Sequence, residues 1–100
     1  MILTVFRSLV KDKAQDPYRS LVPEIVAVAE TMPGFLSRKS YTADDGERLS
    51  LVAFADEQSQ RHWAHNAERL AAKQRRRESF YSEYFVQICH VIRESRYTAP

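Results

Sequence analysis

The chain has 100 residues, of which 44% are hydrophobic, and this size and composition fit one globular domain over residues 1–100 rather than a disordered segment. Lysine and arginine number 15 against 13 aspartates and glutamates, so a formal charge of +2 is too weak to favour nucleic acid as a partner. A single cysteine excludes an internal disulfide, and no apolar run reaches the roughly 20 residues of a membrane span. We therefore expect a cytoplasmic protein with no membrane partner.

The first two predicted elements are a strand at 2–10 and a helix that ends near Met32. The strand carries apolar side chains at odd and even positions, which is typical of a strand covered on both faces. Apolar residues at helical spacing follow. Asp16 before Pro17 can cap this helix, whereas Pro23 favours a start of the regular helix nearer Ser20. The run MPG then ends this helix, because proline and glycine interrupt helical structure.

Residues 35–42 and 49–55 form two predicted strands joined by a turn at 43–47, in which Asp45-Gly46 is the hairpin signal. The second of these strands is again apolar on both faces. Strict alternation in the first strand places four side chains together on one face: Phe35, Ser37, Lys39 and Tyr41.

The last two predicted elements are a helix and a long closing strand. The helix follows Asp56 and ends in the basic run KQRRR, and Trp63 belongs to an apolar stripe that can pack onto a sheet. Residues 80–95 read as the closing strand. The order βαββαβ predicts an α+β, ferredoxin-like fold with an antiparallel four-stranded sheet.

The predicted sheet has more apolar surface than its own helices can cover. Both helices of this fold lie on one face, yet at least three strands carry apolar residues on the opposite face as well. Left exposed, that face would be a larger apolar patch than soluble monomers usually show. A second copy of the sheet is the simplest cover, so we predict a homodimer with a cavity between sheet and helices or at the sheet interface.

Four features of the chain resemble the antibiotic biosynthesis monooxygenase (ABM) domain family. They are the stretches MPGFLSRKSYTADDGERLSL, AERLAAKQRRRESFYSEY and VQICHVIRES, together with Trp63 at the position of the family's tryptophan in the second helix. The resemblance covers essentially the whole chain and implies a dimeric α/β barrel. It also implies a small cofactor-independent monooxygenase that acts on an electron-rich aromatic substrate such as a hydroquinone. The sequence has no glycine-rich dinucleotide loop, so no cofactor is expected.

Two departures from the family pattern bear on activity. Haem-degrading members carry an asparagine in the first strand and a histidine on the second helix, whereas LTVFRSLV has no asparagine and Lys73 lies ten positions after Trp63, so haem degradation is disfavoured. Many relatives carry a His-Pro-Glu-His run just after the tryptophan. In this chain the corresponding residues are Asn66, Ala67, Glu68 and Arg69. The alternative function is therefore a non-catalytic dimeric domain that binds a small ligand or regulates a partner.

The candidate substrate-binding residues are mostly aromatic. Trp63 is expected to form one wall of a pocket for a planar ligand, and the alternative is that it only packs in the core. The resemblance implies that Arg77 and Tyr81 also face the substrate, and Tyr41 is a further candidate. Tyrosines in strands are also common packing residues, so that alternative applies to both tyrosines.

The candidate catalytic residues are His90 and Tyr84, which share a strand face by alternation. His90 could act as a general base, and the alternative is a core or interface histidine. Tyr84 could donate a hydrogen bond to a substrate oxygen. His62 and His65 are neighbours on one helical surface, but no cysteine or carboxylate completes a zinc site with them, so no metal is expected.

Overall fold

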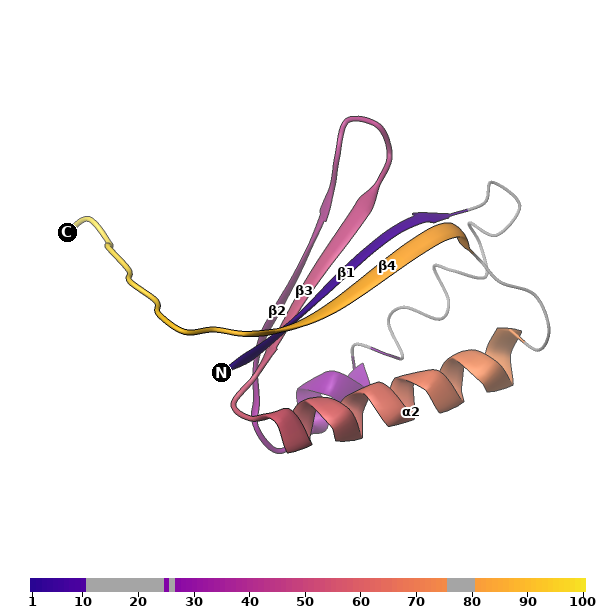
Figure 1. Ribbon diagram of the computed structural model, residues 1–100, viewed down its shortest axis with the longest axis horizontal. Coiled ribbons are helices and arrows are strands. Elements are labelled where there is room, and N and C mark those ends of the chain that lie inside the picture. The colour runs from indigo at the N-terminus through magenta and orange to yellow at the C-terminus, as the bar shows by residue number, and fades with distance from the viewer. Residues whose placement is uncertain (11–24, 26, 76–80) are drawn as a thin grey trace.

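The computed structural model describes residues 1–10, 25, 27–75 and 81–100, which form one sheet and two helical segments (Figure 1). A shorter helical segment spans residues 27–31, and the predicted helix start near Ser20 lies outside the described residues. The labelled elements, in chain order, are β1 (Ile2–Val10), β2 (Phe35–Thr42), β3 (Arg48–Phe54), α2 (Glu57–Arg75) and β4 (Tyr81–His90).

The strands lie in the order β2-β3-β1-β4, and each is antiparallel to its neighbours. The central strands β1 and β3 carry apolar residues at both odd and even positions, a pattern typical of strands covered on both faces. Helix α2 and the 27–31 segment lie on the same side of the sheet (Figure 1). The predicted α+β, ferredoxin-like fold with an antiparallel four-stranded sheet is confirmed.

The core lies between the helical layer and the central strands. Phe54 is fully buried there with Val52 and Ala29, and Phe35 and Trp63 pack against this cluster. Burial of one phenylalanine side chain contributes about 1.5–3 kcal/mol of transfer free energy. Trp63, which belongs to the apolar stripe predicted for this helix, therefore faces the sheet.

Strand β2 begins with a β-bulge that changes which side chains share a face. Phe35 pairs with Phe54, and the register shifts before Ser37, so that Leu36 is an extra residue with no partner in the pairing. Phe35 consequently lies on the helix-facing side, while Tyr41 lies on the opposite side. The prediction that Phe35 and Tyr41 share one face was wrong, because strict alternation holds only in a strand without a bulge.

The turn between β2 and β3 forms where the hairpin signal predicted it. The backbone N–H of Gly46 donates to the carbonyl of Ala43 at 3.0 Å, and the N–H of Glu47 donates to Oδ1 of Asp45 at 2.9 Å. Gly46 has a φ of 91°, in the left-handed region that glycine adopts without steric cost. The Asp45 side chain thus binds a backbone N–H of the turn, and Gly46 supplies the positive φ. These are the reasons that aspartate and glycine are common in turns.

The first turn of α2 packs closely on the bend that precedes β2. Asp56 caps the helix, since its Oδ1 accepts the backbone N–H of Ser59 at 2.8 Å. Gly34 in the bend has a φ of 85°, and its carbonyl accepts the N–H of Ala55 at 2.7 Å. A Cβ on Gly34 would lie 2.9 Å from the Cβ of Ser59, so there is no room for a side chain at this position.

Strand β4 ends at His90, which is earlier than predicted. The backbone N–H of Val91 still donates to the carbonyl of Met1 at 3.0 Å, but β1 begins at Ile2 and offers no further partner. The prediction that this strand extends through Ser95 was therefore wrong. Residues 91–100, here called the C-terminal arm, lead away from the sheet (Figure 1).

The side of the sheet opposite α2, here called the open face, is rich in apolar side chains. Phe85 on this face is 50% exposed, and the half-buried residues beside it belong to the central strands. The side chains of β1 and β3 that form its centre are Leu3, Val5, Leu49 and Leu51. Among the described residues nothing covers this face, as the sequence predicted for a single copy of the chain.

Candidate functional site

The helix-facing side of the sheet carries a wall of aromatic rings. Trp63 of α2 lies tilted against Phe54, with ring centroids 5.6 Å apart and an interplanar angle of 34°. Phe54 in turn meets Phe35 edge to face, at 5.9 Å and 77°. The indole Nε1–H of Trp63 donates to the carbonyl of Ile25 at 3.2 Å, which fixes the ring between the two helical segments. Trp63 therefore packs in the core, and because it is only partly buried, some of its surface stays accessible.

Polar side chains follow the aromatic wall along the same side of the sheet. The amide Nε2 of Gln60 donates to Thr4 Oγ1 at 3.2 Å, and both residues are buried. Ser8 lies four residues further along β1, about 14 Å from Thr4 at the usual rise per strand residue. It is 2% exposed, and its hydroxyl has no hydrogen-bond partner among the described residues. A buried hydroxyl without a partner is uncommon, so Ser8 is a position at which a ligand oxygen would be favoured.

His90 lies in the same row of the sheet as Phe54. Ile2 pairs with Phe54 on one side and with His90 on the other, so the three residues share the helix-facing side. Two strand spacings separate His90 from Phe54, which corresponds to about 10 Å. Its side chain is exposed. The structure thus brings His90 to the end of the site where Trp63 lies.

The remaining predicted site residues are located less completely. Tyr84 pairs with Ser8 and Tyr81 pairs with Val10 through their backbones, while their side chains lie outside the described part of the structure. Arg77 lies outside the described residues altogether. The pairing places Tyr84 beside the unpartnered hydroxyl of Ser8 in the sheet, at the opposite end from His90.

Tyr41 is separated from this site by the sheet. It lies on the open face, where the Lys39 ammonium is 5.7 Å from its ring centroid. Trp63 lies on the other side, so the two residues do not line the same cavity between the sheet and helices of one chain. The β2 bulge, which the sequence pattern did not reveal, is the reason for this separation.

Sequence reasoning missed Ser8 and Gln60 as site residues. Ser8 stands in the run ILTVFRSLV, and its position in the alternation is that of the buried residues Ile2 and Thr4. A hydroxyl in this position of an apolar strand was the available signal. Gln60 had no comparable signal, because its contact with Thr4 depends on how α2 docks on the sheet.

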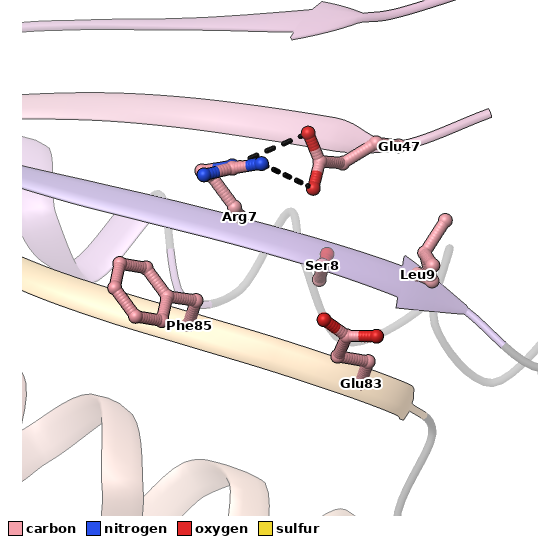
Figure 2. Close-up of a pocket in the computed structure, with 6 residues that line it drawn as sticks. All are labelled: Arg7, Ser8, Leu9, Glu47, Glu83 and Phe85. Carbon is pink, nitrogen blue, oxygen red and sulfur yellow. Dashed lines mark hydrogen bonds and ion pairs between the residues drawn. The ribbon is translucent and has the colours of Figure 1, made fainter. Parts of the chain in front are cut away.

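A hollow lies at one end of the open face, and Ser8 of the helix-facing site is among the residues that line it (Figure 2). The Arg7 guanidinium binds the Glu47 carboxylate in a two-point contact, with Nε to Oε1 at 3.2 Å and Nη2 to Oε2 at 3.0 Å. The same guanidinium lies 6.0 Å from the ring centroid of Phe85. The hollow is lined by Arg7, Ser8, Leu9, Glu47, Glu83 and Phe85.

Comparison with known proteins gives both a family and a fold. The family model for antibiotic biosynthesis monooxygenases matches residues 1–75. YqjZ, an uncharacterised protein of Bacillus subtilis strain 168, is 30% identical over 90 residues, which are 90% of this chain and 79% of YqjZ.

Two solved structures have the same fold at low sequence identity. Rv0793 from Mycobacterium tuberculosis superposes with a TM-score of 0.78 at 13% identity, over 95% of this chain and 98% of that chain. A mutant of SnoaB, a cofactor-independent oxygenase from Streptomyces nogalater, gives a TM-score of 0.72 at 14% identity, over 93% of this chain and 94% of that chain. At such identities these matches establish the fold and leave the chemistry to be argued from the site.

Proposed function

The chain belongs to the antibiotic biosynthesis monooxygenase family, and from that premise we propose that it is a small cofactor-independent monooxygenase for an aromatic substrate of the hydroquinone or phenol class. The observation that carries the proposal is the partly buried indole of Trp63, which rests against the buried ring of Phe54 and leaves surface against which a planar ring can pack. The fold shared with SnoaB, a cofactor-independent oxygenase, supports the reaction type.

The proposed chemistry requires a base and a place for negative charge. His90 removes a proton from the substrate, and the resulting phenolate or carbanion passes one electron to dioxygen. The substrate radical and superoxide combine to form a carbon–oxygen bond, and His90 returns its proton to the resulting peroxide. The hydroperoxide then loses water, so one oxygen atom enters the quinone product and the other leaves as water. Trp63 shapes the pocket and keeps water away from the ring.

The polar end of the site supplies hydrogen bonds to substrate oxygens in this proposal. The Ser8 hydroxyl is buried and has no partner among the described residues, so it can donate to an oxygen that gains negative charge. Tyr84, Tyr81 and Arg77 remain proposed contacts with substrate oxygen or the substrate ring. Tyr41 would contact a substrate only in a cavity formed at the open face, since it lies on that side of the sheet.

Oxygen uptake by metal-free protein, with a panel of dihydroxyarenes and anthrones, tests the reaction. We expect a quinone product and a loss of about 10²–10⁴-fold in turnover for His90→Ala, because a positioned base contributes roughly that factor. His62→Ala is the matched control, since His62 is an exposed histidine on α2. Uptake that survives His90→Ala would exclude His90 as the base, and absence of uptake across the panel would favour the second function below.

The second candidate function is a non-catalytic dimeric domain that binds a small apolar ligand or regulates a partner. It is favoured by the residues after Trp63, where the histidines common in the family are replaced by Asn66, Ala67, Glu68 and Arg69. Such a domain would show a rise in melting temperature with ligand and no product. Haem degradation is disfavoured on the same kind of sequence ground, because Lys73 stands ten positions after Trp63.

We further propose that two copies of the chain associate through their open faces. The central strands present half-buried leucine and valine side chains there, and Phe85 is half exposed. An apolar face of this kind is usually covered by a partner, and a two-fold dimer covers both copies at once.

Three wider features of the proposal concern the chain as a whole. Residues 1–100 are taken as one domain with no nucleic-acid partner, in keeping with the net charge of +2. A cytoplasmic location fits the single free cysteine, Cys89. In the described part of the chain, no helix has the length and hydropathy that a membrane crossing requires.

A further inference from the structure

The helix-facing side of β4 carries two exposed apolar side chains. Val86 is 43% exposed and Ile88 is 55% exposed. Ile88 pairs with Thr4, and directly paired residues of antiparallel strands lie on one side of the sheet, so Ile88 shares the side on which Thr4 meets α2. Val86 lies two residues before Ile88 and shares that side by alternation. These side chains therefore offer apolar surface to a flat ligand between the sheet and α2.

The side chain of Gln60 lies beside this apolar surface, and part of its hydrogen-bonding capacity is unused. Gln60 is 4% exposed, and Thr4, whose Oγ1 accepts the Gln60 Nε2–H at 3.2 Å, is also 4% exposed. A primary amide has two N–H donors and a carbonyl oxygen that can accept twice. No further hydrogen bond joins this amide to the described residues. Because buried polar groups are nearly always paired, the second N–H and Oε1 are favoured contacts for a polar ligand atom.

A single aromatic ring on Trp63 can reach both His90 and Gln60. Gln60 and Trp63 are three positions apart on α2, so they are neighbours on its surface. His90 pairs with Ile2, two residues before Thr4, which places the backbones of His90 and Thr4 about 8 Å apart at the usual strand rise and spacing. One ring with a hydrogen bond of roughly 2.8 Å at each end fits a gap of this order.

Ser8 is too distant to bind the same ring. It lies six residues from Ile2 along β1, about 20 Å at the usual strand rise, and Ile2 is the residue paired with His90. An oxygen on the ring that His90 deprotonates therefore lies within reach of Gln60, whereas Ser8 can meet only a substituent well removed from that ring. The two polar positions thus bind different parts of a substrate.

We propose that Gln60, held in place by Thr4, binds a second oxygen on the reacting ring and so selects dihydroxyarenes over monohydroxyarenes. In the function proposed above, on which this inference rests, His90 takes the proton of the first hydroxyl. Oε1 of Gln60 accepts a hydrogen bond from the second hydroxyl, and its free N–H donates when that oxygen becomes a phenolate or a quinone carbonyl. Thr4 is a positioning residue, since its hydroxyl orients the amide without contacting the substrate. The apolar edge of the ring packs on Ile88.

Calorimetric titration without oxygen tests the contact separately from turnover. 1,4-Dihydroxynaphthalene and 1-naphthol differ by one hydroxyl, and we expect the wild-type chain to bind the first about tenfold more tightly, as one buried hydrogen bond provides. In Gln60→Leu this preference should fall to about twofold or less, because an apolar side chain of similar size cannot pair with the hydroxyl. Gln58→Leu is the matched control, since Gln58 is exposed on the same helix, and it should keep the preference. Equal preferences in the wild-type chain and Gln60→Leu would overturn the proposal.

Variants of Thr4 test the positioning role without changing α2. Thr4→Val keeps the shape of the side chain and removes its hydroxyl, so the preference for the dihydroxy ligand should fall about threefold to tenfold, with little change in 1-naphthol binding. Thr4→Ser keeps the hydroxyl and should restore the preference. An unchanged preference in Thr4→Val, or an equal loss for both ligands, would exclude Thr4 as the residue that orients Gln60.

Oxygen uptake with the same two compounds separates the role of Gln60 from the proposed function. Uptake by the wild-type chain, with an unchanged ratio of kcat/KM for the two compounds in Gln60→Leu, would overturn the role of Gln60 and retain the enzyme. A hydroxyl preference in binding that depends on Gln60, without uptake of oxygen by any variant, would retain the contact and favour the ligand-binding domain.

Discussion

Ser8 has a buried hydroxyl that lacks a hydrogen-bond partner among the described residues. The variant Ser8→Ala can therefore separate a role in substrate binding from a role in stability. Replacing an unsatisfied buried hydroxyl with a methyl group removes a desolvation cost, so we expect Ser8→Ala to keep or raise the free energy of unfolding by up to about 1 kcal/mol. If the hydroxyl binds a substrate oxygen, kcat/KM should fall roughly tenfold in the same variant.

The control for Ser8 is Ser50→Ala, because the Ser50 hydroxyl is already paired with Ser40 at 3.0 Å. That variant should lose about 1 kcal/mol of stability, through loss of the pair, with little effect on kcat/KM. Urea unfolding and oxygen uptake measure the two quantities separately. A fall in stability for Ser8→Ala would show that its hydroxyl has a partner within the fold.

The stabilisation of the first turn of α2 by Asp56 depends on pH. The backbone N–H of Ser59, and next its side chain, hold the pKa of Asp56 below its ordinary value of 3.8. Because this pKa is lower in the folded chain, the carboxylate contributes its full stabilisation above the unfolded pKa and loses it as pH falls through the folded pKa. Asparagine caps helices about as well but does not titrate, so below about pH 4 the wild-type melting temperature should fall more steeply than that of Asp56→Asn. Parallel curves from pH 6 to pH 2 would rule out this cap as a source of acid sensitivity.

At the scale of elements, the bend before β2 fixes how α2 docks. Gly34 combines a φ of 85° with close contact to Ser59, whereas Gly46 has a φ of 91° with nothing within 4 Å of an added Cβ. Gly46→Ala should therefore lose about 1–2 kcal/mol through its backbone alone. Gly34→Ala adds a steric conflict with α2 and should lose about 3 kcal/mol or more in total. Equal losses in chemical denaturation would show that the helix shifts to make room.

Alternation of side chains in the sequence predicted which residues share a face in β4 but not in β2. Alternation along β4 correctly grouped His90 with Tyr84 on one face of the strand, because this strand follows β1 without irregularity between Leu9 and the end of the pairing at Ile2. Alternation did not tell which side of the sheet that face is. In β2 the identical reasoning failed for Tyr41, because one bulged residue reverses every later position. A bulge at Leu36 leaves no composition signal, so alternation alone could not reveal it.

For the whole molecule, the element order, the fold class and the uncovered sheet face followed from hydrophobic periodicity. Only part of the candidate site could be predicted from the same periodicity. Trp63 was found as the largest residue of an apolar stripe, but its partner atom, the carbonyl of Ile25, depends on the packing of two helical segments that are distant in sequence. Ser8 and Gln60 are candidate site residues because they are buried. A sequence pattern predicts the burial of a polar residue less directly than it predicts secondary structure.

The bulge at the start of β2 also affects whether copies of the chain can associate into an open-ended fibre. β2 is an outer strand, and an outer strand with free backbone groups can pair with the same strand of another molecule and so build a continuous fibre. The extra Leu36 distorts the beginning of that edge, and exposed Arg38 and Lys39 place positive charge along it. Like charges would meet if two such edges approached. The chain is thereby biased towards a closed assembly of fixed size and away from open-ended polymerisation at high concentration.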